Sequence, residues 1–228
     1  MMMRAASPAV NKVGRQYDSS GRRRQAERTR ARVLDVARRL FLTDGYAVTT
    51  VASIASGSSV SVETVYKSFG GKSGLVRALH DTSLRGAGPV PAEERSDAMA
   101  GRASNPHEIV HGWGRLTTEV MPRVAPILLL VRAAAGADPE MSALRRETED
   151  ARLARMQHNA RYLWDAGHVR VGIGLAQARD VLFAYSAPEL YETLVLRQGW
   201  SLDVYGDFVA QGIAAALLDP VGRSAVQP

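Results

Sequence analysis

Apolar residues recur with a period close to 3.6 through almost all of this 228-residue chain, and no stretch of strict alternation lies between turn signals. The pattern predicts an all-α protein. We expect a first helix from Arg22 to the Asp44-Gly45 pair, with glycine in the left-handed position that ends a helix. Further helices are expected over 50–57, 61–68, from Lys72 onward, and over 105–120, 122–136, 139–165, 174–185, 187–198 and 201–218.

The first four helices predict a small bundle. The helices at 50–57 and 61–68 span barely two turns each, and helices this short are stable only when they pack on others. Thr50 and Ser61 stand where each would need an N-cap. The residues expected to be buried in the first helix are Val33, Leu34, Ala37, Leu40 and Phe41, and those in the next two are Val51, Ile54, Ala55, Val65 and Phe69.

The two short helices fit a helix-turn-helix. This motif needs a small residue where the helices cross, a tight turn, and apolar residues on the inner face of the second helix, which Ala55, Ser58-Ser59 and Val65 supply. The outer face of the second helix could then enter a DNA major groove. The side chains expected there are Ser61, Val62, Glu63, Thr64, Tyr66 and Lys67.

Hydroxyl groups and charges around this pair suit contact with DNA phosphates. Thr49 and Thr50 stand at a helix N-terminus, Tyr66 offers an O–H group, and Lys67 and Lys72 offer charge. Each also has a structural alternative, because Thr50 could serve only as a cap, Tyr66 could complete the core, and Lys67 could be plain surface.

The net charge of +6 is concentrated at the N-terminus. Residues 1–32 hold nine basic and two acidic side chains, whereas the rest holds twenty basic and twenty-one acidic ones. A basic arm beside a nearly neutral body is typical of a chain that binds a polyanion with one domain, and we expect Arg22, Arg23 and Arg24 to contact DNA. A solvated tail or an Arg-rich transit peptide is the alternative.

Composition narrows the class of protein. Cysteine is absent, which excludes disulfides and thiolate metal sites. No apolar run approaches the roughly 18 residues of a membrane span, and the N-terminus lacks the apolar core of a secretory signal. We therefore expect a soluble cytoplasmic protein with no membrane partner.

Residues 30–81 carry a resemblance to a known family. "VLDVARRLF", the "GY" turn, "TTVASIA", "VSVETVYKSF" and "KSGLVRAL" together resemble the N-terminal domain of the TetR family of bacterial transcriptional regulators. The resemblance implies a homodimer that binds a palindromic operator, with a C-terminal helical domain that dimerises and often binds an effector. The sequence departs at Ser58-Ser59, where the family usually has Ala-Gly, and serine in a left-handed turn costs roughly 1 kcal/mol relative to glycine.

These observations divide the chain into four parts. We expect a disordered arm over 1–20, a helix-turn-helix DNA-binding domain over 21–80, a larger helical effector-binding and dimerisation domain over 81–220, and a flexible tail over 221–228.

The segment "HEIVH", His107 to His111, matches the zinc-binding H-E-x-x-H pattern. Three observations weigh against zinc. Glu108 is placed to complete a capping box with Asn105, both histidines point away from the apolar face of the helix, and no third ligand or substrate-binding sheet is evident. Histidines on a polar face, or in an effector site, are the alternatives. We expect no metal, no catalytic residue, no cofactor and no enzymatic activity.

The C-terminal helices present apolar faces that could form a dimer or simply a core. For the dimer interface we expect Leu190, Leu194, Tyr205, Phe208, Val209, Gly212 and Ile213. An effector pocket would lie among the central helices, where mostly apolar residues and a few polar ones could line it. The residues suggested for it are His111, Trp113, Met121, Arg132, Met156, Trp164, Phe183 and Tyr185, each of which could instead be ordinary core.

Taken together, the sequence predicts a DNA-binding transcriptional regulator, a repressor that is released from its operator by a small, largely apolar effector. A ligand-independent architectural DNA-binding protein and a zinc hydrolase remain as alternatives.

Overall fold

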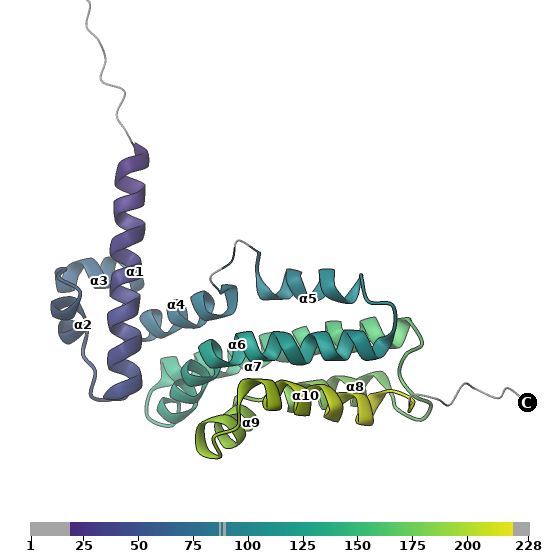
Figure 1. The fold of residues 1–228 in the computed structure, drawn as a ribbon. Coiled ribbons are helices and arrows are strands. Elements are labelled where there is room, and N and C mark those ends of the chain that lie inside the picture. The colour runs from purple at the N-terminus through teal and green to yellow at the C-terminus, as the bar shows by residue number, and fades with distance from the viewer. Residues whose placement is uncertain (1–18, 87, 89, 221–228) are drawn as a thin grey trace, which may run out of the picture.

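The computed structural model describes residues 19–220 except 87 and 89, and these form helices and loops with no strand among them (Figure 1). The all-α prediction is confirmed. Residues 1–18 of the predicted arm 1–20 and the predicted tail 221–228 lie outside the described residues, whereas residues 19 and 20 belong to the first helix. The elements are α1 Ser19–Thr43, α2 Val51–Gly57, α3 Val62–Phe69, α4 Lys72–Arg85, α5 Ala92–Ala100, α6 Pro106–Ala134, α7 Pro139–Asp165, α8 Leu175–Tyr185, α9 Pro188–Tyr191, the π-helical turn η1 Glu192–Arg197, and α10 Leu202–Leu217.

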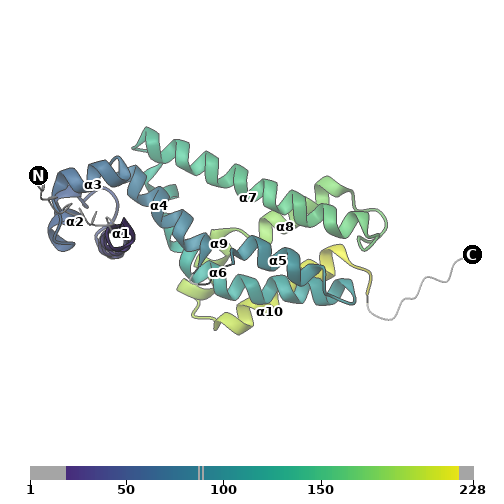
Figure 2. The ribbon, with the colours of Figure 1, turned by 90° about the horizontal axis from the view of Figure 1, so that it is seen from above.

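Helices α1 to α3 form a small bundle at one end of an elongated molecule, and α4 leads from it to the larger group (Figure 1, Figure 2). In that group α6 packs on α10, α4, α5 and α7, while α7 also packs on α8. Helix α6 is therefore the central element of the larger domain.

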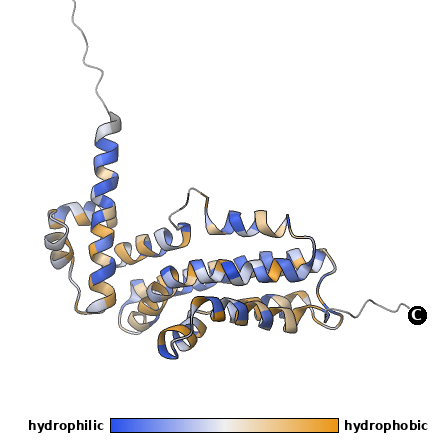
Figure 3. Cartoon of the chain, viewed as in Figure 1, coloured by the Kyte–Doolittle hydropathy of each residue, from blue (hydrophilic) through white to orange (hydrophobic). Residues whose placement is uncertain are grey.

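The expected apolar stripe of α1 lies in the core of the small bundle. Ala37 and Phe41 are fully buried, as are Ile54 of α2 and Val65 of α3, whereas the N-terminal half of α1 is hydrophilic (Figure 3). The same apolar cluster extends beyond the bundle into the larger domain, whose contributions to it include Ile127, Val131, Met141 and Leu144. The small bundle thus shares one core with α6 and α7.

The turn between α2 and α3 contains Ser59 at φ 54°, the one non-glycine residue of the described chain with a positive φ. Ser58 is fully buried, and its hydroxyl donates to the carbonyl of Ile54 at 2.7 Å. The amide of Val60 donates back to the carbonyl of Ala55 at 3.0 Å, which closes the turn as in other helix ends with a left-handed residue. The second serine of the pair therefore takes the conformation that glycine would take more readily.

The predicted pair of helices at 105–120 and 122–136 is wrong, because α6 runs without a break through Pro122 and Pro126. Proline removes a backbone donor and usually bends or ends a helix. Here Met121, Val124 and Ile127 bury their side chains on both sides of the prolines. This packing against several neighbouring helices compensates for the lost hydrogen bonds.

Helices α6 and α10 approach closely at a pair of glycines. A methyl group on Gly114 would lie 2.5 Å from the carbonyl oxygen of Gly206, and one on Gly206 would lie 3.0 Å from the oxygen of Gly114. No other residue type fits this crossing without moving the helices apart.

The single helix expected over 187–198 is present in two parts. Pro188 starts α9, and the chain widens into a π-helical turn from Glu192. The Glu192 carboxylate lies between Arg132 of α6, at 3.5 Å, and Arg197, at 2.6 Å. The first residue of the π-helical turn, Glu192, thus forms ion pairs with two arginines.

We expect Ser59→Gly to raise the free energy of unfolding by up to about 1 kcal/mol, because glycine adopts this positive φ without steric cost. Ser56→Gly is the matched control, since Ser56 is exposed within α2 and glycine there should lower stability by about 0.5–1 kcal/mol. Denaturant unfolding of both variants measures the difference. A loss of stability at both positions would contradict the left-handed turn.

Candidate nucleic-acid interface and cavity

Helix α3 has one buried and one exposed face. Val65 is fully buried against the bundle, whereas Val62 is 42% and Tyr66 53% exposed, and Glu63 and Lys67 are exposed beside them. Ser61 caps the helix, because its hydroxyl oxygen accepts from the amide of Thr64 at 3.1 Å. The structure therefore gathers the predicted reading side chains on one accessible surface.

Within this set, the hydroxyls of Ser61 and Thr64 lie 2.8 Å apart and pair with each other. Thr64 is half-buried. A groove-facing contact from Thr64 would therefore come from its methyl group or from a shared hydroxyl.

The expected phosphate contact from Thr49 is wrong. Thr49 is only 3% exposed, and its hydroxyl donates to the carbonyls of Gly45 at 2.8 Å and Leu40 at 3.2 Å. It therefore fastens the loop before α2 to the end of α1. Thr50 is exposed and forms a reciprocal capping box with Ser53.

The predicted basic residues occupy different environments. Lys72 is half-buried, with its ammonium group 4.2 Å from the centre of the Tyr46 ring. Arg22, Arg23 and Arg24 are exposed on α1, and Arg23 pairs with Glu27 at 3.1 Å.

Two other arginines of the basic segment hold the motif together. Arg30 donates to the carbonyl of Ser68 at 3.1 Å and lies over the Phe69 ring, and Arg32 donates to the carbonyl of Ser58 at 2.9 Å. Their charge is evident from the sequence, but their hydrogen bonds to the backbone of the helix-turn-helix are not.

Polar contacts that the sequence did not reveal join the bundle to α6 and α7. The Tyr46 hydroxyl donates to Asp138 at 2.7 Å, and Asp138 also caps α7 through the amides of Glu140 and Met141. The hydrogen bond from Tyr46 holds the pKa of Asp138 below its usual value, and burial together with Asp138 raises the pKa of Tyr46.

Three further contacts cross the same boundary. Ser73 donates to Glu140 at 2.6 Å, Arg77 pairs with Glu147, and Arg38 donates to the carbonyl of Arg123 at 3.1 Å. The start of α7 is thus attached to the loop before α2 and to α4.

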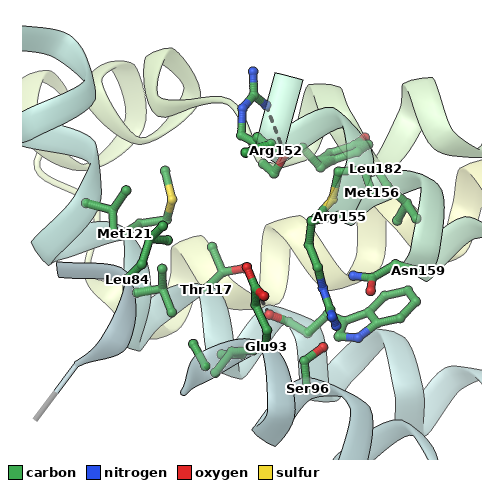
Figure 4. Close-up of a pocket in the computed structure, with 18 of the residues that line it drawn as sticks. Leu84, Glu93, Ser96, Thr117, Met121, Arg152, Arg155, Met156, Asn159 and Leu182 are labelled. Carbon is green, nitrogen blue, oxygen red and sulfur yellow. Dashed lines mark hydrogen bonds between the residues drawn. The ribbon is translucent and has the colours of Figure 1, made fainter. Parts of the chain in front are cut away.

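A cavity of about 210 Å³ lies among α4, α5, α6, α7, α8 and α10 (Figure 4). Its wall is mostly apolar. Of the residues expected in an effector pocket, Trp113, Met121, Met156 and Tyr185 line it.

The other four expected residues lie elsewhere. His111 is exposed, and Trp164 is 41% exposed. Arg132 pairs with Glu189 at 2.6 Å, and Phe183 lies under the guanidinium group of Arg152 at 3.5 Å. The expectation for these four is wrong, because none of them lines the cavity. Two of the side chains are exposed, and the other two have partners within the protomer.

The apolar face expected for a dimer is partly core. Tyr205, Val209 and Ile213 are at most 4% exposed, which leaves them no surface for a second chain, and this part of the expectation is wrong. A methyl group on Gly212 would meet the Tyr185 hydroxyl at 2.4 Å, so its small size serves a contact within the protomer. The expected residues that keep accessible surface are Leu190, Leu194, Phe208 and Gly212.

The HEIVH segment is explained by helix capping. Asn105 accepts from the amide of Glu108 at 3.0 Å, and the Glu108 carboxylate accepts from the amide and the hydroxyl of Ser104. These hydrogen bonds hold the pKa of Glu108 below its usual value. His111 is exposed, and the described residues contain no group of three or more potential ligands that could hold a metal ion.

Comparisons with known proteins agree with this geometry. Residues 33–79 match the family described as bacterial regulatory proteins, tetR family. Over 69 residues the chain is 35% identical to YvkB of Bacillus subtilis (strain 168), an uncharacterised HTH-type transcriptional regulator; the match covers 30% of this chain and 36% of that protein. The chain thus matches only about a third of the length of this curated relative.

Solved structures share the whole fold. A protein described as a TetR-family transcriptional regulator from Syntrophomonas wolfei str. Goettingen superposes with a TM-score of 0.67 and 20% identity, covering 88% of this chain and 99% of that one. SmeT in complex with triclosan gives a TM-score of 0.65 at 20% identity, with the same coverage. No helix in the described part of the chain is long and apolar enough to cross a membrane.

We expect Tyr46→Phe to lower the free energy of unfolding by about 1 kcal/mol at pH 7, since it removes a hydrogen bond to a charged group at a partly exposed site. The pKa of Asp138 is lowered in the folded protein, so its stabilisation is complete above the unfolded value near 3.9 and is lost as the pH falls through the folded value. The cost of the substitution should therefore shrink in acid.

Tyr162→Phe is the control for this measurement, because the Tyr162 hydroxyl donates to the neutral carbonyl of Ala100 at 2.9 Å. Its cost should not depend on pH between 3 and 7. Denaturant unfolding across this range compares the two variants, and a pH-independent cost for Tyr46→Phe would contradict the assigned interaction.

Proposed function

We propose that this chain, whose residues 33–79 match the TetR family of bacterial regulatory proteins, represses transcription as a cytoplasmic homodimer bound to a palindromic operator. A small, largely apolar effector releases it from DNA. In this proposal the residues from 21 to 80 bind DNA, and those from 81 to 220 bind the effector and dimerise.

The observation that carries the proposal is the exposed face of α3. Val62, Glu63, Tyr66 and Lys67 project from a helix that is fixed from behind by Val65 and capped by Ser61. A short helix held this way can enter a major groove without deforming. Thr50, Lys72 and the arginines at the start of α1 flank it and would contact the phosphates.

Exposed apolar side chains support the second copy of the chain. Val204 and Leu196 are 52% and 54% exposed, and Phe208 is 38% exposed on the same helix as Val204. Together with Leu190 and Leu194 these residues offer a surface that a symmetric partner would cover. A two-fold dimer places two reading helices about 34–36 Å apart, as a palindromic site requires.

The position of α4 supports release by an effector. Leu75 and Val76 are buried in the core that holds α3, while His80 and Leu84 on the same helix line the cavity. A ligand that moves α4 would therefore change the spacing of the two reading helices and favour a state that fits the operator poorly. The solved complex of SmeT with triclosan shows that a protein of this fold binds a small molecule.

Selection of bound fragments from a genomic DNA pool tests the proposal. We expect the purified chain to enrich an inverted repeat with half-sites one helical turn apart. Binding without a repeat would favour an architectural protein, and no binding to DNA would overturn the regulator itself.

Single substitutions in α3 should separate phosphate contact from base recognition. Lys67→Ala should weaken binding to all sequences alike and reduce the salt dependence by about one unit of slope, because one phosphate contact is lost. Thr64→Ala should instead change which sequences bind best. Fluorescence anisotropy on a set of operator variants at several salt concentrations measures both effects.

Arg161→Ala is the matched control, because Arg161 is an exposed basic residue on α7, in the larger domain. It should leave affinity and salt dependence unchanged. An equal loss for Arg161→Ala and Lys67→Ala would mean that net charge, not the α3 surface, drives binding.

A further inference from the structure

The cavity has a polar end and an apolar end, and we propose that its ligand is an uncharged molecule with an apolar body and one hydrogen-bonding head group, such as a hydroxyl. The proposal rests on the effector role given above but names the chemistry of the ligand. The polar end carries Ser96 of α5 and Asn159 of α7 (Figure 4), and Trp113 of α6 also lines the cavity.

All three side chains are buried, and one of them, Trp113, has a buried polar atom without a partner in the described structure. Ser96, Trp113 and Asn159 are 3%, 7% and 7% exposed, and the indole N–H of Trp113 has no acceptor. Other buried polar groups on the cavity wall are satisfied, such as Thr148, whose hydroxyl donates to the carbonyl of Arg145 at 2.9 Å. Because buried polar groups in proteins are almost always hydrogen-bonded, the unpaired N–H of Trp113 on the cavity wall indicates a site for a ligand acceptor atom.

The three groups define what the head group must do. The Trp113 N–H can only donate, so the ligand needs an acceptor atom. Asn159 and Ser96 can both donate and accept, so a head group that also carries a hydrogen would pair with them as well. In Figure 4 Ser96 and Asn159 lie at the same end of the cavity, away from Leu84 and Met121.

The cationic side chains near the polar end are already paired with a carboxylate. Arg155 binds Asp97 through both of its terminal nitrogens, at 2.6 and 3.3 Å, and His158 lies 3.2 Å from the same carboxylate. Glu93 also lines this end. A ligand carboxylate would therefore meet Glu93 without an unpaired cation. A ligand ammonium group could pair with Glu93, but it has no acceptor atom for the N–H of Trp113.

The remaining arginine on the wall does not supply an anion site either. Arg152 donates to the carbonyl of Phe183 at 2.7 Å and to the hydroxyl of Ser186 at 3.0 Å, and it stacks on the Phe183 ring. Its charge is oriented by these contacts toward α8. A neutral head group is the class that the wall accommodates.

The rest of the cavity suits an apolar body of moderate size. Leu84 and Met121 lie at the end away from Ser96 and Asn159 (Figure 4), and Val124 and Leu128 also line the cavity. The volume of about 210 Å³ exceeds the cavity of about 150 Å³ that is known to take benzene. One ring with a short chain is therefore a suitable size of probe.

Four matched probes test the head group: 3-phenylpropan-1-ol, 3-phenylpropanoate, 3-phenylpropylammonium and propylbenzene. Calorimetric titration into the full-length protein without DNA should give the alcohol an affinity at least tenfold above the other three. Equal or tighter binding of the carboxylate, the amine or the hydrocarbon would overturn the proposal, as would the absence of binding by all four.

Two substitutions locate the head group. Ser96→Ala and Asn159→Leu should each reduce the advantage of the alcohol over propylbenzene by roughly three- to tenfold, the size of one net hydrogen bond.

Thr148→Val is the control, since Thr148 lines the same cavity on α7 but its hydroxyl is already bonded. It should leave the ratio unchanged, and an equal change there would overturn the assignment to the polar cluster. Because these titrations contain no DNA, they are independent of the regulatory role. Tight binding of the alcohol without release of operator DNA would overturn effector release alone, and operator release by a charged ligand alone would overturn the head-group class alone.

Discussion

The arrangement of the molecule depends on one continuous apolar core that joins the small bundle to the larger domain. Phe41 and Leu75 lie in the same cluster as Ile127 of α6 and Met141 of α7. Because protein interiors are close-packed, a displacement of α6 or α7 must be accommodated by the helices that share this core. The polar contacts around Tyr46 and Asp138 border the same junction and fix the register of α7 against the loop before α2. The orientation of α3 is therefore set as much by the larger domain as by its own bundle.

The close crossing of α6 and α10 complements this core at the opposite side of α6. Gly114 and Gly206 allow backbone contact there, so α6 is held on one side by the shared core and on another by a crossing that leaves no space for a side chain. The cavity lies beside this fixed helix, among elements that include α4 and the short α5.

Local sequence signals predicted the small bundle well because its elements are determined by local chemistry. Thr50 and Ser61 cap α2 and α3, and Val65 follows the helical period, so residues close in sequence decide these features. Helix α6 was missed as a unit because proline is a strong local signal, whereas the packing that carries the helix through Pro122 comes from distant residues. Periodicity likewise revealed an apolar face on α10 but could not tell whether α6 or a second chain covers Tyr205. For the same reason only half of the expected cavity residues line the cavity, since aromatic residues such as Trp113 and Trp164 look alike in sequence but lie in different environments.

The unpaired N–H of Trp113 on the cavity wall has a consequence for the amount of protein present in a cell. Polar atoms buried without partners make the ligand-free fold less stable than its packing would allow. A ligand that pairs with them binds the native state and not the unfolded chain, so its concentration adds to the free energy of unfolding. Differences of this kind change how often a chain is unfolded and exposed to proteases. A ligand that accepts from the N–H of Trp113 would in this way make the lifetime of the protein depend on the ligand concentration.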